Sequence, residues 1–231
     1  MKQKLQFSIL LLFINLFATA QTFDVGNLRY NITSGTNVSV QKTNTNPTGA
    51  LTIPATVVNV GVTYSVTSIS DNGFSNCPGL TSVDIPNTVT NIGINAFQFC
   101  AALTSITLPN SITSISNTLF YGCSSLTSLV IPNSVTTIGT AAFFGCSNLS
   151  SVTIPNSVTL IGFQSFVNCS SLTSLTIPNS VTTIENQAFR YCTGLTSVTV
   201  HWTTPLLINA DVFQNINTTI IPLNVPSGSE A

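Results

Sequence analysis

The sequence predicts a solenoid built from 23-residue coils, with a parallel β-sheet along one face and short helical or 3₁₀ turns and loops on the other. Residues 131–153 match residues 177–199 at 15 of 23 positions, and the same frame covers residues 62–199 as six cycles. Positions that are one repeat apart form columns, and several columns are apolar in every cycle. A repeat of this length cannot bury its apolar face alone, so stacked coils must supply the core.

Five apolar columns predict the inward face of each coil. In the cycle that starts at residue 131 they pass through Val135, Ile138, Phe143, Leu149 and Val152. One column contains only phenylalanine, at Phe74, Phe97, Phe120, Phe143, Phe166 and Phe189. Such regular columns predict ladders of like side chains along the solenoid axis.

The end of each cycle predicts a short strand. Leu149–Ile154 alternates apolar and polar residues and is rich in β-branched side chains. Pro155 then ends the strand, because it lacks an N–H group, and the following Asn156 favours a turn. Equivalent strands should pair in parallel, about 4.8 Å apart, as one long sheet. Residues 142–148 show no alternation, which predicts a short helical or 3₁₀ turn with its Phe and Cys pointing inward.

The recurring unit L-x-x-V/I-x-I-P-x-x-V-x-x-I-G-x-x-A-F-x-x-C resembles the bacterial leucine-rich repeats of the BspA-like (Treponema) type over residues 62–199. The Ile-Pro, Ala-Phe and Cys positions recur in phase. The resemblance implies a leucine-rich-repeat solenoid on an exported or surface protein, with binding or adhesion as its role. It names no ligand.

The two ends of the chain depart from the repeat. Residues 1–20 are typical of a signal peptide, with Lys2 and Lys4, an apolar run and cleavage after Ala20. We therefore expect a secreted or cell-surface protein with no transmembrane segment in the mature chain; an uncleaved anchor is the alternative. Residues 21–61 predict a β-rich N-terminal cap, in which Asp24 and Arg29 are solvated residues. Residues 200–231 predict a degenerate seventh coil, shifted by one residue, and an incomplete C-terminal cap.

The six cysteines share one column: Cys77, Cys100, Cys123, Cys146, Cys169 and Cys192. An even number in an exported chain ordinarily indicates disulfides. Here each Cys lies beside the Phe column, where a thiol packs as a small hydrophobe. We therefore expect buried free thiols, with disulfides and metal binding as alternatives.

Composition excludes several functions. Charged residues make up 5% of the chain, so no basic track for nucleic acid is present. His201 is the only histidine and has no neighbouring carboxylate in the frame, and Asp71, Asp84, Glu185 and Asp211 are scattered over different coils. No phosphate-binding glycine loop occurs. The sequence thus predicts a protein that is not an enzyme and binds no cofactor or metal.

The outward positions of the strands are the candidate binding face. They are Ser105, Thr107, Ser128, Val130, Ser151, Thr153, Ser174, Thr176, Ser197 and Thr199. This ladder, on the presumed concave face, predicts a monomeric binding or adhesion module for proteins or polysaccharides. The loops on the far side, with Phe99, Tyr121, Phe144 and Tyr191, are a second candidate surface. The alternative functions are a structural spacer that displays a further C-terminal region and a binder of a periodic solid such as ice.

Overall fold

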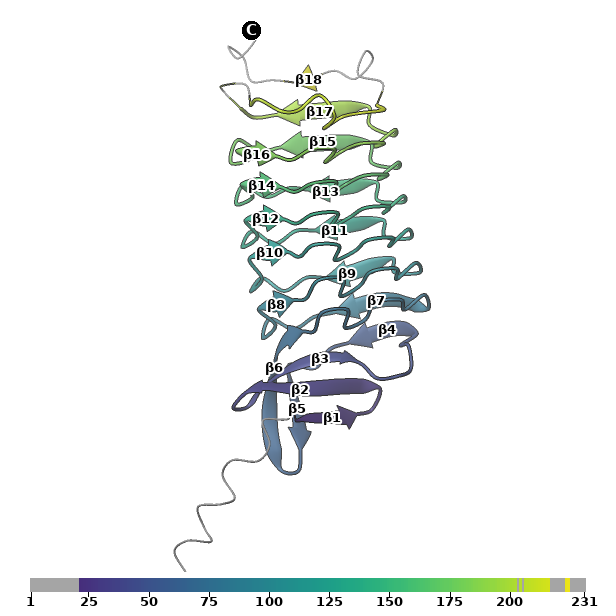
Figure 1. The fold of residues 1–231 in the computed structure, drawn as a ribbon, viewed down its shortest axis with the longest axis vertical. Coiled ribbons are helices and arrows are strands. Elements are labelled where there is room, and N and C mark those ends of the chain that lie inside the picture. The colour runs from purple at the N-terminus through teal and green to yellow at the C-terminus, as the bar shows by residue number, and fades with distance from the viewer. Residues whose placement is uncertain (1–20, 203, 205, 217–222, 225–231) are drawn as a thin grey trace, which may run out of the picture.

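The computed structural model describes residues 21–202, 204, 206–216 and 223–224. The predicted signal peptide and the chain beyond Asn224 lie outside these residues. Coils are stacked along the long axis of the molecule, above a twisted sheet at the N-terminal end (Figure 1). No helix occurs among the described residues. The predicted solenoid with parallel sheets is confirmed.

Four strands of residues 21–61 and the strand that begins the first coil form the N-terminal sheet. Its strand order is β1-β2-β3-β6-β5. The strands are β1 (Thr22–Val25), β2 (Leu28–Ser34), β3 (Asn37–Lys42), β5 (Thr56–Asn59) and β6 (Val62–Ile69). Asp24 and Arg29, predicted to be solvated, form an ion pair of 2.9 Å between Oδ1 and Nε on the surface. The Arg29 guanidinium holds the pKa of the Asp24 carboxyl below its ordinary value.

The predicted strands of the repeat form a first series of parallel strands, one from each successive coil. The series comprises β4 (Gly49–Thr52), β7 (Leu80–Asp84), β9 (Ser105–Thr107), β11 (Ser128–Val130), β13 (Ser151–Thr153), β15 (Ser174–Ile177), β17 (Ser197–Val200) and β18 (Leu223–Asn224). The sequence predicts one continuous sheet, but ladder pairing stops between β9 and β11 and between β13 and β15. At these steps the N–H groups of Thr127 and Thr173 lie 3.5 and 3.4 Å from the carbonyls of the coil below. The first series is therefore three sheets in line.

A second series of strands, which the sequence pattern did not predict, lies on another side of the coils (Figure 1). It comprises β8 (Asn91–Ile92), β10 (Ser114–Ile115), β12 (Thr137–Ile138), β14 (Leu160–Ile161) and β16 (Thr183–Ile184). Strands β10, β12, β14 and β16 form one parallel sheet, and β8 pairs with β6. Each of these strands is a single pair of residues, which is too short for alternation to be visible in the sequence.

The sequence predicts a helical or 3₁₀ turn in the second half of each coil. The structure has a run of turns there instead, in which alternate main-chain N–H groups bond within the coil and to the next coil. The N–H of Phe144 donates to Ala141 O within the coil, whereas that of Phe143 donates to Ser165 O of the next coil. Ala141 and Gly145 have φ of 51° and 73°. Two left-handed residues in each turn prevent a continuous helix.

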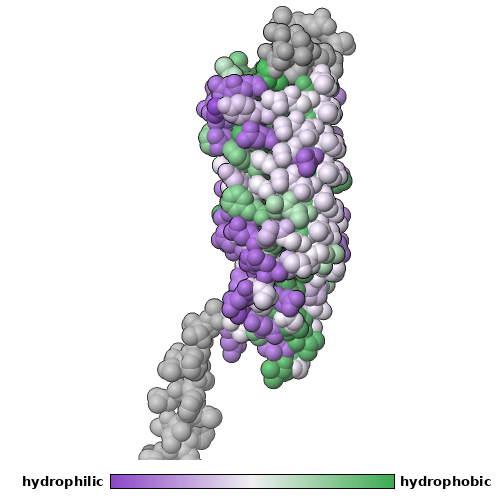
Figure 2. All heavy atoms as spheres, turned by 90° about the vertical axis from the view of Figure 1, so that its right-hand side faces the viewer, coloured by the Kyte–Doolittle hydropathy of each residue, from purple (hydrophilic) through white to green (hydrophobic). Residues whose placement is uncertain are grey.

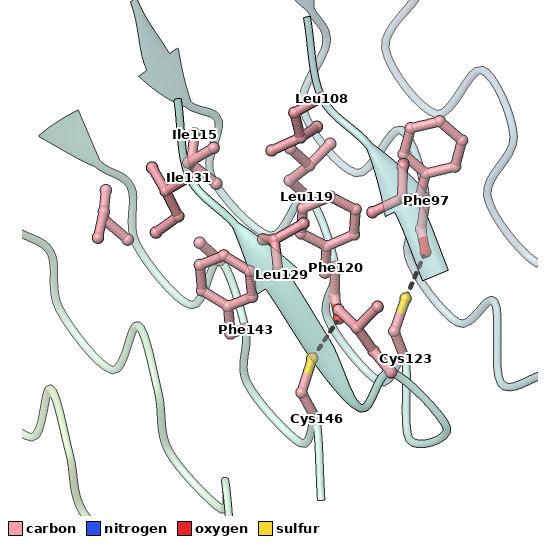
Figure 3. Packing of buried hydrophobic residues seen from close by; sticks show 14 of the residues in the cluster. Phe97, Leu108, Ile115, Leu119, Phe120, Cys123, Leu129, Ile131, Phe143 and Cys146 are labelled. Carbon is pink, nitrogen blue, oxygen red and sulfur yellow. Dashed lines mark hydrogen bonds between the residues drawn. The ribbon is translucent and has the colours of Figure 1, made fainter. Parts of the chain in front are cut away.

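The core is a single cluster that runs through all coils and includes the Phe column. Figure 3 shows Phe97, Phe120 and Phe143 among its residues. Neighbouring rings stack from Phe74 to Phe213, with centroids 4.9–6.0 Å apart. Phe213 joins the column although it lies one position beyond a full repeat from Phe189, as the predicted insertion requires. Ile208, shifted in the same way, is exposed instead.

All six cysteines are buried free thiols. Five of them donate a hydrogen bond from Sγ to the carbonyl of a Phe in the coil below, at 3.1–3.3 Å; Figure 3 shows the bonds of Cys123 and Cys146. Burial raises the pKa of Cys123 to about 12 and raises the pKa of Cys146 and Cys169 well above the ordinary value. The column therefore combines apolar packing with satisfied thiol donors.

Ser165 is a polar residue buried in the apolar core. It occupies a column that holds alanine in three other coils, and its Oγ is buried with no hydrogen-bond partner among the described residues. We expect Ser165→Ala to raise the free energy of unfolding by about 1–2 kcal/mol, because an unpaired buried hydroxyl is destabilising. Urea denaturation would measure this. The control is Ser157→Ala, whose Oγ donates to Val135 O at 2.6 Å, and which should lower stability by about 1 kcal/mol. A loss of stability in both variants would contradict the assignment.

Candidate binding surface

The ten predicted residues lie together on the outer side of the first series of strands, and we call them the hydroxyl face: Ser105, Thr107, Ser128, Val130, Ser151, Thr153, Ser174, Thr176, Ser197 and Thr199. They point outward because the residue between each pair, such as Ile106 or Val152, is buried in the core. Equivalent residues face each other across paired strands; Ser128 pairs with Ser151, and Ser174 with Ser197. Eight of the ten are exposed.

The top of the hydroxyl face is partly covered. Ser197 and Thr199 are half-buried, and their strand β17 pairs with β18, in a register that aligns the backbone of Thr199 with that of Asn224. Val130, at 78% exposure, interrupts the ladder of hydroxyls at mid-length. The accessible part of the face therefore extends from β9 to β15.

Two adjacent groups of hydroxyl side chains differ in their hydrogen-bond partners. Thr104, Ser150 and Thr196 belong to a column just before the strands. Each donates its hydroxyl hydrogen to a main-chain carbonyl of the coil below, with the two oxygens 3.0–3.1 Å apart. The hydroxyls of the face from β9 to β15 have no such partner within the described residues: Ser105, Thr107, Ser128, Ser151, Thr153, Ser174 and Thr176. The column of Thr104 therefore joins neighbouring coils, whereas the hydroxyls of the face from β9 to β15 are free to bond to solvent or to a ligand.

The surface of the central coils carries no formal charge. Residues 85–184 contain no Asp, Glu, Lys, Arg or His. Two carboxylates at the ends of this region bond to the main chain: Asp71 Oδ1 accepts the N–H of Ile94 at 2.8 Å, and Glu185 Oε2 accepts that of Phe163 at 2.6 Å. Figure 2 shows one side of the solenoid as largely pale, with hydrophobic side chains gathered about half-way along it. The central coils must therefore recognise a ligand through neutral groups.

Aromatic residues of the turns meet on the surface of the central coils. The ring of Tyr121 stacks on Phe144 with centroids 4.7 Å apart, and Phe99 meets Tyr121 edge to face at 5.3 Å. We call Phe99, Tyr121 and Phe144 the aromatic cluster. Tyr191, predicted for the same surface, lies apart from it, with the guanidinium of Arg190 over its ring at 4.8 Å.

In the part of the chain that the structure describes, no three His, Cys, Asp or Glu side chains lie close enough to hold a metal ion. His201 is exposed, and its main-chain N–H donates to Ile177 O at 3.1 Å. Its neighbour Trp202 is half-buried and donates from Nε1 to Val181 O at 2.9 Å. Through these hydrogen bonds both residues join the terminal coil to the coil before it.

Residues 54–169 and 113–230 match the model of the BspA-type leucine-rich repeat region, with six copies. The chain belongs to this family. A leucine-rich repeat protein from Bacteroides ovatus is similar in structure over 89% of this chain and 77% of its own, at 19% identity and a TM-score of 0.57. The Treponema pallidum leucine-rich repeat protein is similar over 89% and 85%, at 22% identity and a TM-score of 0.51. These likenesses support the fold of the BspA-type chain.

No curated protein matches the sequence. Among the residues that the structure describes, no helix is long and apolar enough to cross a membrane.

Proposed function

We propose that this BspA-type repeat protein is an exported, non-enzymatic module that binds a protein or polysaccharide at the cell surface or outside the cell. The hydroxyl face is the observation that carries the proposal. From β9 to β15 it extends over several coils, is exposed, and leaves its hydroxyls without internal partners among the described residues. Stacked repeats produce extended surfaces of this kind, which solenoids use for binding. The predicted signal peptide supports export.

The test is binding of residues 21–231 to an array of glycans and matrix proteins, beside a variant with arginine at Ser105, Ser128, Ser151 and Ser174. These side chains point away from the core, so the variant should fold. We expect it to lose binding by tenfold or more, because four long charged side chains would cover the face. The control places arginine at the exposed turn residues Asn110, Asn133, Asn156 and Asn179, which adds the same charge after the strands. Equal binding by all three proteins would contradict a site on the hydroxyl face.

A second function is favoured by the periodicity of the same face. Exposed hydroxyls recur at each coil, about 4.8 Å apart along the axis, which suits a periodic solid such as ice. Growing ice crystals in the presence of the mature protein would test it. Faceted crystals with wild type and round crystals with the four-arginine variant would support ice binding, and round crystals with both would dispose of it.

A further inference from the structure

One column of the turns requires a left-handed backbone in every coil. Its residues are Asn76, Phe99, Gly122, Gly145, Asn168, Tyr191 and Asn215, with φ between 54° and 73°. Glycine and asparagine adopt this conformation readily, whereas a bulky aromatic residue there is an outlier. Phe99 and Tyr191 thus occupy positions that the fold would fill more easily with glycine. Strained residues of this kind concentrate at functional sites.

The neighbours of Phe99 leave room for its ring and place it in the aromatic cluster. A Cβ built on Gly122, the next residue of the column, would lie 2.6 Å from Cδ1 of Phe99, so the absence of a side chain at Gly122 lets the ring lie against that coil. Phe99 remains 45% exposed while it contacts Tyr121, and Tyr121 stacks on Phe144. Three coils thus contribute to one apolar surface.

Only neutral polar groups surround this surface. Gln98 precedes Tyr121 in the same column, and neither the Gln98 amide nor the Tyr121 hydroxyl has a hydrogen-bond partner among the described residues. No ionisable acid or base other than Tyr and Cys occurs from residue 85 to 184. The cluster therefore combines exposed ring area with free neutral donors and acceptors, and offers nothing to a phosphate, sulfate or carboxylate.

We infer that the aromatic cluster is a binding site for a neutral polysaccharide. A sugar ring presents an apolar C–H face and a rim of hydroxyls; the face fits against Phe99 and Tyr121, and the rim bonds to groups such as the Gln98 amide. This ligand meets the surface without burying an unpaired charge. The inference rests on the proposed binding function and gives it a ligand class and a second site.

Phe99→Gly is the sharpest test, because glycine already occupies this column at Gly122 and Gly145. The variant should keep the circular dichroism spectrum and thermal midpoint of wild type. Its control is Tyr191→Gly, which removes an aromatic from the same column and backbone conformation outside the cluster. Affinity electrophoresis through gels that contain dextran, soluble starch, laminarin or xyloglucan measures the dissociation constants.

We expect wild type and Tyr191→Gly to bind at least one of these polysaccharides equally, with an affinity that changes less than twofold between low and high concentrations of NaCl. Phe99→Gly should bind it at least tenfold more weakly. Full binding by Phe99→Gly together with loss in the four-arginine variant would overturn this site and leave the hydroxyl face as the binding surface. If wild type bound matrix proteins but no polysaccharide, the inference of a polysaccharide ligand would be overturned and the proposed function would stand. If wild type bound neither, both would be overturned.

Discussion

The free energy of unfolding should fall steeply as the pH rises from about 9 towards 12. Burial raises the pKa of Cys123 to about 12 and that of Cys146 and Cys169 well above the ordinary value of 9.0. In this range the unfolded chain releases the protons of these three thiols, whereas the folded chain keeps them, so alkali favours unfolding. The pKa of Cys100 is raised as well, by its contact with Cys77 and by burial, and acts in the same direction. Each thiol adds a slope of about 1.4 kcal/mol per pH unit, or about 4 kcal/mol for the three together.

Urea denaturation at a series of pH values, followed by circular dichroism, measures this slope. Stability should be constant below about pH 8 as far as these thiols are concerned, because both states are then protonated. Cys146→Ala should reduce the slope by about 1.4 kcal/mol per pH unit, whatever it does to stability at neutral pH. A free energy of unfolding that stays level up to about pH 11 would show that the thiols ionise freely in the folded protein, contrary to the buried column.

Phe143→Ala is expected to lower the free energy of unfolding by about 3–5 kcal/mol. Phe143 is fully buried and stacks between Phe120 and Phe166, so its removal leaves a cavity in the middle of the column. Truncation at this site should also lower the thermal midpoint by roughly 6–20 °C, given the size of the chain. Differential scanning calorimetry gives both quantities.

Phe144→Ala is the matched control, because it removes the same ring from the next residue. Phe144 is half-buried at the surface, where its ring stacks on Tyr121. We expect this variant to lose about 1 kcal/mol of stability. Equal losses in the two variants would mean that the inward and outward positions have been assigned wrongly.

The inward columns could be predicted from the sequence because each one repeats a single kind of residue in every coil. Phe143, Cys146 and Leu149 illustrate this: all three are fully buried, as their columns predict. The outward direction of Ser151 and Thr153 followed from the same frame, since they alternate with Val152 in a strand. Outward position alone does not select a partner, so the repeat pattern names no ligand for these exposed residues.

Other features depend on geometry that periodicity does not encode. The strand Thr137–Ile138 is too short to show alternation, and the breaks between the three in-line sheets follow from small changes in hydrogen-bond length. The left-handed backbone at Phe99 contradicts the local preference of phenylalanine, so only the asparagines and glycines of its column could have indicated it. The meeting of Phe99 with Tyr121 joins two different columns, so no single column of the repeat predicts it.

The register of the repeat can be tested directly by deleting one whole coil, positions 131–153. The deletion joins Val130 to Ile154, so that Ile154 replaces Ile131 and Phe166 stacks on Phe120 in place of Phe143. The control is the deletion of positions 131–152, which is shorter by one and leaves Thr153 as an extra strand residue, so that Ile154 turns outward. We expect cooperative thermal unfolding and a wild-type circular dichroism spectrum after the whole-coil deletion, and a strongly destabilised chain after the shorter deletion. Equal stability of the two deletions would contradict a solenoid whose stacked coils all share one repeat length.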